Sequence, residues 1–126
     1  MAQGFLQSFN KDLTVCSAGT RPAGKVSDKA IAVMKETGID LSNHYPKSVD
    51  IYLTEAWDYV ITVCDDANET CPAFLGTVKH RLHIGFEDPS KVTGTDKFIW
   101  SEFRRVRDEI MNKFYELYTE HIKPQL

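Results

Sequence analysis

Two cysteines seven positions apart are the residues of this chain that could most clearly do chemistry. Cys64 directly follows an apolar run, and Cys71 is followed by a proline. On one continuous helix their Cα atoms would be about 10 Å apart at roughly 1.5 Å per residue, whereas a disulfide requires Cα atoms within about 7 Å. A bridge would need that segment to unwind, and such an easily reduced bond suits a catalytic disulfide. Two unrelated buried thiols are the alternative reading, because free cysteine is among the most buried residue types.

Length and composition indicate one ordinary domain. The chain has 126 residues, 42% of them hydrophobic, enough to bury a core without disulfides or metals. Its net charge of -3 offers no basic surface for nucleic acid. No stretch approaches the roughly 18 apolar residues of a membrane span, and the first residues do not resemble a secretion signal. We therefore expect a single domain over residues 1–126, located in the cytoplasm, that binds neither nucleic acid nor membranes.

Strand and helix patterns alternate along the chain. Helical spacing of apolar residues predicts helices at residues 1–9, from 27 or 28 to 37, around 49–57, and over about 97–121. Apolar and β-branched runs predict strands at residues 13–16, 59–63 and 80–86, the second apolar enough to be buried on both faces. This order predicts an α/β fold, in which a parallel sheet carries helices on both faces.

The predicted strands bring distant residues to one edge of the sheet. Three segments each follow the carboxyl end of a predicted strand: the loop after Cys16, the pair Cys64 and Cys71, and Asp88. Ligands of parallel α/β sheets bind beyond these strand ends. We therefore expect Asp88 within about 10 Å of Cys64.

Several segments together resemble the thioredoxin-coupled arsenate reductases, which have the low-molecular-weight protein tyrosine phosphatase fold. They are Cys64 and Cys71 with Pro72, the Gly-Phe-Glu-Asp-Pro run at 85–89, the Thr-Gly-Thr turn at 93–95 and residues 103–110; Ser-Ala-Gly at 17–19 and Ser-Asn-His at 42–44 fit as well. The resemblance extends from Met1 to about Ile110. It implies a phosphotyrosine phosphatase I-like parallel sheet.

One part of the family pattern is missing from these 126 residues. In that family a loop of the form Cys, five residues, Arg carries the nucleophile, and this chain contains no such sequence. The chain opens at what resembles the first helix behind that loop. The resemblance therefore implies an N-terminally truncated domain that lacks the first strand of the fold. In the family's sheet this central strand lies between the strands that correspond to residues 13–16 and 59–63. We expect the chain as given to be inactive.

The resemblance assigns roles to three residues. Cys64 would attack the arsenylated nucleophile and release arsenite, and Cys71 would then form the disulfide with Cys64 that thioredoxin reduces. Asp88 matches the general acid that protonates the leaving oxygen; without the family context, an Asp-Pro turn would be the simpler reading. The resemblance implies arsenate or a phosphate-like oxyanion as ligand, thioredoxin as reductant, and no bound cofactor or metal. Gln3 and Lys47 stand where some relatives carry acidic potassium ligands, so we expect no potassium requirement.

Cys16 offers an alternative nucleophile. Cys16 and Arg21 follow a predicted strand and imitate the phosphatase loop, but only four residues separate them. One fewer amide would shrink the anion-binding ring, and Pro22 disfavours a helix directly behind it. We interpret Cys16 as a packed thiol at a strand end.

Two other functions compete with arsenate reduction. A low-molecular-weight protein tyrosine phosphatase would share the fold and Asp88, but it needs no cysteine pair, and its Asp-Pro is commonly followed by an aromatic residue where this chain has Ser90. A non-catalytic remnant of the fold is the third possibility. The DNA upstream of the Met1 codon would separate these readings.

Overall fold

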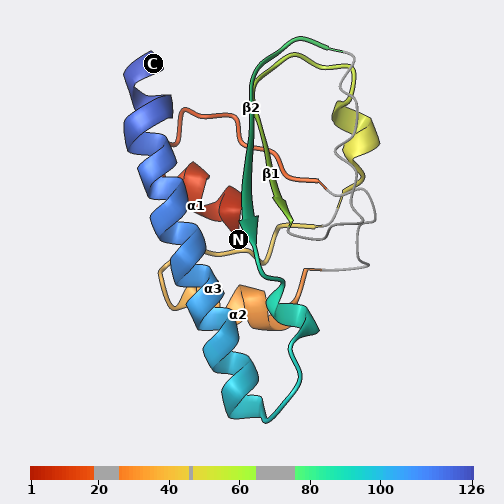
Figure 1. Ribbon diagram of the computed structural model, residues 1–126, viewed down its shortest axis with the longest axis vertical. Helices are drawn as coiled ribbons and strands as arrows, with labels where there is room; N and C mark the ends of the chain where they lie inside the picture. The colour runs from red at the N-terminus through yellow and green to blue at the C-terminus, as the bar shows by residue number, and fades with distance from the viewer. Residues whose placement is uncertain (19–25, 46, 65–75) are drawn as a thin grey trace.

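A computed structural model describes residues 1–18, 26–45, 47–64 and 76–126 (Figure 1). Residues 19–25, 46 and 65–75 and the side chain of Cys64 lie outside that description. In chain order the described elements are helices α1 (Ala2–Phe9) and α2 (Asp28–Lys35), the 3-10 helix η1 (Val49–Tyr52), strands β1 (Trp57–Cys64) and β2 (Val78–Phe86), the 3-10 helix η2 (Pro89–Lys91), helix α3 (Asp96–Leu117), the π turn η3 (Tyr118–Ile122) and the 3-10 turn η4 (Lys123–Gln125).

Helix α3 begins and packs as its sequence predicts. The Thr95 side chain caps it by accepting a hydrogen bond of 3.2 Å from the Phe98 amide. Asp96 in the first turn complements the helix dipole. Apolar residues three or four positions apart form one buried face: Phe103, Val106, Ile110, Phe114 and Leu117. The predicted end near residue 121 corresponds to the π turn that continues the helix.

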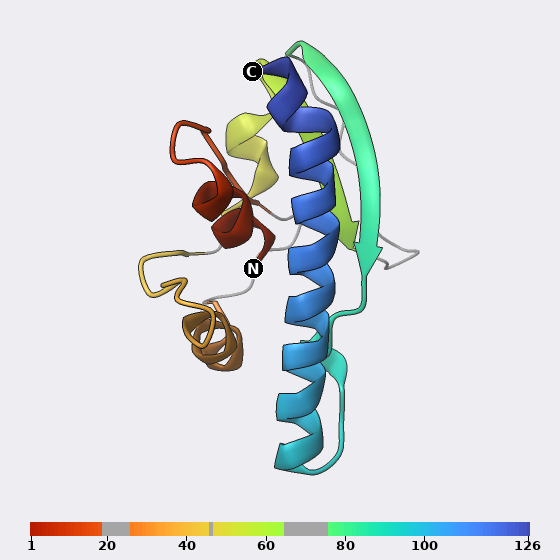
Figure 2. The same ribbon diagram turned by 90° about the vertical axis from the view of Figure 1, so that its left-hand side faces the viewer.

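The core is built around this face of α3. Phe5 and Leu6 of α1, Met34 of α2 and Phe86 of β2 belong to the same buried cluster. The Phe86 and Phe114 rings stack with centroids 6.1 Å apart. Figures 1 and 2 both show α3 running the length of the molecule with the other elements arranged along it. The core therefore joins elements from both ends of the chain.

Strands β1 and β2 pair in parallel, as predicted, although both are longer than expected. Gly76, just ahead of β2, lies very close to the backbone of Glu55. A Cβ atom added at residue 76 would lie 2.1 Å from the Glu55 carbonyl oxygen. Within β1, Tyr59 and Ile61 are only half-buried, and Val63 is 38% exposed. Among the described side chains of β1 none is fully buried, so the predicted burial of this strand on both faces is wrong there.

The predicted strand at residues 13–16 is also wrong. These residues form no strand ladder in the described part of the chain. Instead, side-chain amides of α1 bind their carbonyl groups: Gln7 Nε2 donates to the Leu13 oxygen at 2.7 Å, and Gln3 Nε2 donates to the Val15 oxygen at 3.1 Å. A strand needs a neighbouring backbone to pair with, and here α1 meets two of those hydrogen-bonding needs.

Helix α2 is held against α3 by burial and by charge. Val33 and Ala30 pack with Phe103 in a second buried cluster. Glu36 at the end of α2 accepts hydrogen bonds from Arg104 and Arg107 at 2.9 and 2.7 Å. Beyond it, Gly38 adopts the left-handed backbone conformation that favours glycine, with φ of 84°, and closes the helix.

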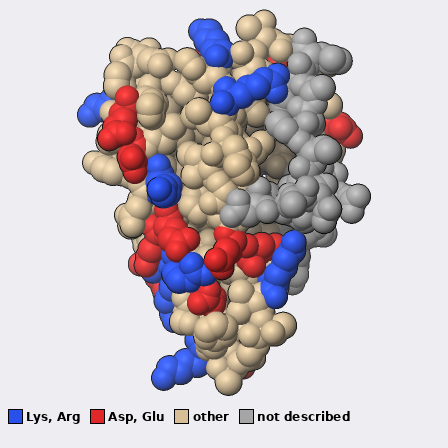
Figure 3. All heavy atoms as spheres, in the orientation of Figure 1, with Lys and Arg blue, Asp and Glu red and all other residues tan. Residues whose placement is uncertain are grey.

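The described part of the chain thus contains two parallel strands with helices, and a larger sheet with helices on both faces stays a prediction. Lys and Arg lie intermixed with Asp and Glu on the face shown in Figure 3. Among the described helices, none is both long and apolar enough to cross a membrane.

We expect Phe114→Ala to destabilise the protein by about 3–5 kcal/mol, because it leaves a cavity beside Phe86 in the core. Phe98→Ala on the same helix is the control, since Phe98 is 46% exposed and should lose far less. Urea unfolding of both variants measures the difference. Equal losses would contradict the described packing of α3.

We also expect acid to weaken the contact between α2 and α3. Hydrogen bonds from Arg104 and then Arg107 lower the pKa of Glu36 from 4.5 to about 2. Because the pKa is depressed in the folded state, the stabilisation is present above pH 4.5 and is lost as the pH falls toward 2. Glu36→Gln should therefore be less stable than the parent at pH 6 and equally stable near pH 2. Urea unfolding at several pH values tests this, and a gap independent of pH would contradict it.

Candidate active site

Cys64 is the last residue of β1, at the carboxyl end of the strand. Its backbone pairs with Phe86, the last residue of β2. Cys71 lies outside the described residues, so the predicted disulfide stays a prediction. The observed position agrees with the expectation that Cys64 ends a parallel strand at the edge where ligands of such sheets bind.

A bulge in β2 determines how far the residues after Phe86 lie beyond the end of β1. Thr62 pairs with His83, and Cys64 pairs with Phe86. Between these two pairs β2 therefore contains one residue more than β1. Bulges re-aim side chains and end strand pairing next to functional sites. Here the extra residue brings the turn that carries Asp88 one position closer to the end of β1. Residues 64 and 88 thus lie at the same edge of the strand pair, while the distance from Asp88 to the cysteine sulfur stays a prediction.

Asp88 is exposed between two buried neighbours. Phe86 on one side is 9% exposed, and Pro89 on the other is buried in η2. The Oδ1 atom of Asp88 accepts two hydrogen bonds from Ser90, from its amide at 2.9 Å and from its hydroxyl at 2.6 Å. The Oδ2 atom has no hydrogen-bond partner within the described part of the chain. One carboxyl oxygen is therefore fixed, and the other is available to a ligand or a proton.

Sequence reasoning missed the groups that hold this turn. Ser90 was noted only as the residue that follows the Asp-Pro pair, although an Asp two positions before a Ser is a recognisable turn-capping pattern. Arg105 of α3 was also missed as the partner of Glu87, which it contacts at 2.9 Å. No local pattern indicates that contact, because the two residues are 18 positions apart.

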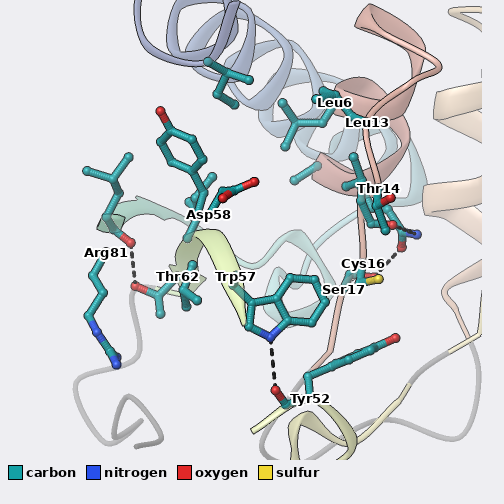
Figure 4. A pocket seen from close by; sticks show the side chains of 18 of the residues that line it. Leu6, Leu13, Thr14, Cys16, Ser17, Tyr52, Trp57, Asp58, Thr62 and Arg81 are labelled. Carbon is teal, nitrogen blue, oxygen red and sulfur yellow. Dashed lines mark hydrogen bonds between the residues drawn. The ribbon is translucent and has the colours of Figure 1, made fainter. Parts of the chain in front are cut away.

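Cys16 lies in a different place from Cys64. It is exposed, so its interpretation as a packed thiol at a strand end was wrong, and it lines a groove of about 1190 Å³ between residues 12–18 and β1. Figure 4 shows its sulfur beside Ser17 and the rings of Trp57 and Tyr52. Burial raises the pKa of the Tyr52 phenol, and a hydrogen bond to Cys16 adds to the effect. Arg21 and the residues directly behind it lie outside the described part of the chain, so the alternative of Cys16 as nucleophile stays untested.

The histidines serve local contacts. His80 stacks on Tyr59 with ring centroids 4.7 Å apart, and His83 Nδ1 lies 2.6 Å from the Thr62 hydroxyl. Burial lowers the pKa of the His44 imidazole. Within the described residues no group of three or more His, Cys, Asp or Glu side chains could hold a metal ion.

Comparison with known proteins decides the family. The model of the low molecular weight phosphotyrosine protein phosphatases matches residues 1–125. The chain belongs to this family. It is 43% identical to an arsenate reductase of Halalkalibacterium halodurans over 87% of this chain and 78% of that protein. It is 40% identical to the arsenate reductase of Bacillus subtilis over 92% of this chain and 83% of that protein.

Solved structures agree on the fold. An arsenate reductase in its phosphate-binding state superposes with a TM-score of 0.77 at 24% identity, covering 94% of this chain and 86% of the other. Another in its reduced state gives 0.75 at 25% identity with the same coverage. The resemblance that extends from Met1 to about Ile110 is thus confirmed as membership of the arsenate reductase branch of the phosphatase family.

We expect mild oxidation of this family member to join Cys64 and Cys71 reversibly. Mass mapping of the oxidised and dithiothreitol-treated protein identifies the bridge. Cys16→Ser should leave its yield unchanged, whereas Cys64→Ser or Cys71→Ser should abolish it. A dominant bridge that contains Cys16 would contradict the assignment.

Proposed function

We propose that this chain is part of an arsenate reductase that works through a thiol–disulfide cascade and is recharged by thioredoxin. The observation that carries the proposal is the 40–43% identity to arsenate reductases over about nine tenths of the chain. The placement of Cys64 and Asp88 at one edge of a parallel strand pair supports it.

The first step forms a bond between sulfur and arsenic. A nucleophilic cysteine thiolate attacks arsenate, one As–O bond breaks, and Asp88 donates a proton so that the oxygen leaves as water. The Oδ2 atom of Asp88 suits this task, because the described residues offer it no other partner while Ser90 holds Oδ1. No Cys, five-residue, Arg sequence occurs in the 126 residues, so we propose that such a loop ahead of Met1 supplies the nucleophile in the working enzyme.

The later steps move two electrons from thiols to arsenic. The Cys64 thiolate attacks the sulfur of the S–As bond, a disulfide forms, and the bonding pair passes to arsenic, which leaves as arsenite. The Cys71 thiolate then attacks Cys64 and releases the nucleophilic cysteine. Thioredoxin reduces the resulting disulfide between Cys64 and Cys71 and becomes oxidised itself. The cascade needs no bound cofactor, and it fits the cytoplasm, where thiols are kept reduced.

We further propose that the working sheet has a third parallel strand between residues 12–18 and β1, as in a phosphotyrosine phosphatase I-like sheet. The groove of about 1190 Å³ lies between these two segments. Tyr59, Ile61, Leu13 and Val15 line it and are only half-buried. A strand inserted there would pair with the outer edge of β1 and bury these side chains.

We expect the 126-residue chain to show no arsenate-dependent turnover, since the nucleophile and the anion-binding loop supply most of the transition-state stabilisation. Adding a strand and a Cys, five-residue, Arg loop ahead of Met1 should restore turnover. The assay follows NADPH consumption with thioredoxin and thioredoxin reductase.

The variants of the extended protein give the controls. Cys64→Ser and Cys71→Ser should each abolish turnover, whereas Cys16→Ser should leave it unchanged. Robust turnover by the 126-residue chain alone would overturn the proposal and would indicate Cys16 as the nucleophile. The tyrosine phosphatase reading would be favoured by two results together. The extended protein would reduce no arsenate, and its phosphatase activity would persist when both Cys64 and Cys71 are replaced.

A further inference from the structure

Arg105 of α3 binds three carboxylates at once. Its guanidinium contacts Glu102 and Glu109 on its own helix and Glu87 in the turn after β2, the last at 2.9 Å. Its pKa is raised, first by the hydrogen bond to Glu102 and then by the one to Glu87. Arg105 is therefore an electrostatic link between α3 and the turn that carries Asp88.

The same turn is anchored to the protein body on either side of Asp88. Phe86 stacks on Phe114 of α3 in the core, and Pro89 is buried. Glu87 lies between these two anchors and is held from outside by Arg105. Asp88 is left exposed, with one oxygen bound to Ser90. Holding Glu87 therefore restricts the backbone at the residue directly before Asp88.

We propose that Arg105 is a positioning residue for Asp88: by holding Glu87 it keeps the turn at residues 86–90 in the conformation in which Ser90 binds Oδ1 and leaves Oδ2 facing outward. The role of Asp88 as the acid rests on the proposed function, whereas the conformation of the turn does not.

The charge balance predicts how the contact fails. Without Arg105, the carboxylates of Glu87, Glu102 and Glu109 lose the guanidinium that all three contact. Like charges repel, so Glu87 should move away from α3 and loosen the backbone between the anchors Phe86 and Pro89. Arg105→Gln should therefore disturb the turn more than Glu87→Gln, which removes one of the three acids along with the contact.

The chain offers a matched control at the next position. Arg104 has a similar exposure, 47% against 39% for Arg105, and also binds a glutamate of another element, Glu36. It points to α2 and contributes nothing to the turn after β2 in the described contacts. Arg104→Gln thus removes a comparable ion pair from the same helix without touching Glu87.

The test measures amide hydrogen exchange of Ser90 by NMR in the full 126-residue chain, because this amide donates to Asp88 Oδ1. Arg105→Gln should speed its exchange about two- to fivefold, the size expected for an exposed ion-pair network. Arg104→Gln should leave it unchanged while both variants unfold at similar temperatures. The charge swap Glu87→Arg with Arg105→Glu should restore slow exchange, because the new arginine again faces acids on α3.

Unchanged exchange in Arg105→Gln, an equal change in Arg104→Gln, or failure of the swap to restore protection would each overturn the proposal. These outcomes are independent of the arsenate assay. A protein without arsenate reduction can still show the Arg105 effect, and an active one can lack it.

Discussion

The apolar face of α3 is the constraint on which the rest of the structure depends. Its buried residues contact α1, α2 and β2, which come from three separate parts of the sequence. An isolated two-stranded parallel sheet has too little buried area to be stable by itself. The strand pair therefore depends on Phe86 stacking against Phe114, and with it the edge at which Cys64 and Asp88 lie.

The strand pair determines where Cys64 and the turn that carries Asp88 are placed. Parallel pairing puts the carboxyl ends of β1 and β2 at one edge, so Cys64 and Phe86, which are 22 positions apart in the sequence, become pairing partners. The bulge before Phe86 then decides how far the following turn reaches past the end of β1. A change of one residue in this bulge would shift the turn that carries Asp88 by about 3.3 Å relative to the end of β1.

Polar contacts play two different parts in this fold. The contacts of Glu36 with Arg104 and Arg107 join two helices whose apolar faces already pack, so they add to an existing interface. The side chains of Gln3 and Gln7 do something else, because they bind backbone carbonyls of a segment that has no strand partner among the described residues. A buried or half-buried carbonyl needs a donor, and a helix side chain is an adequate substitute where no strand is adjacent.

The sequence by itself determined the elements whose signals are local. The spacing of apolar residues in α3 and the parallel arrangement of β1 and β2 could be predicted, because each depends on residues close in the chain or on a strand order with few solutions. The resemblance from Met1 to about Ile110 was confirmed for the same reason, since it rests on short motifs of local spacing. The outcome differed for residues 13–16, whose β-branched residues fit a strand. A strand forms only beside another strand, and in the tertiary structure glutamine side chains of α1 bind the carbonyl groups of this segment instead. The half-exposed faces of β1, the bulge before Phe86 and the contact of Arg105 with Glu87 were likewise decided by tertiary packing, because each depends on which distant groups meet and in what register.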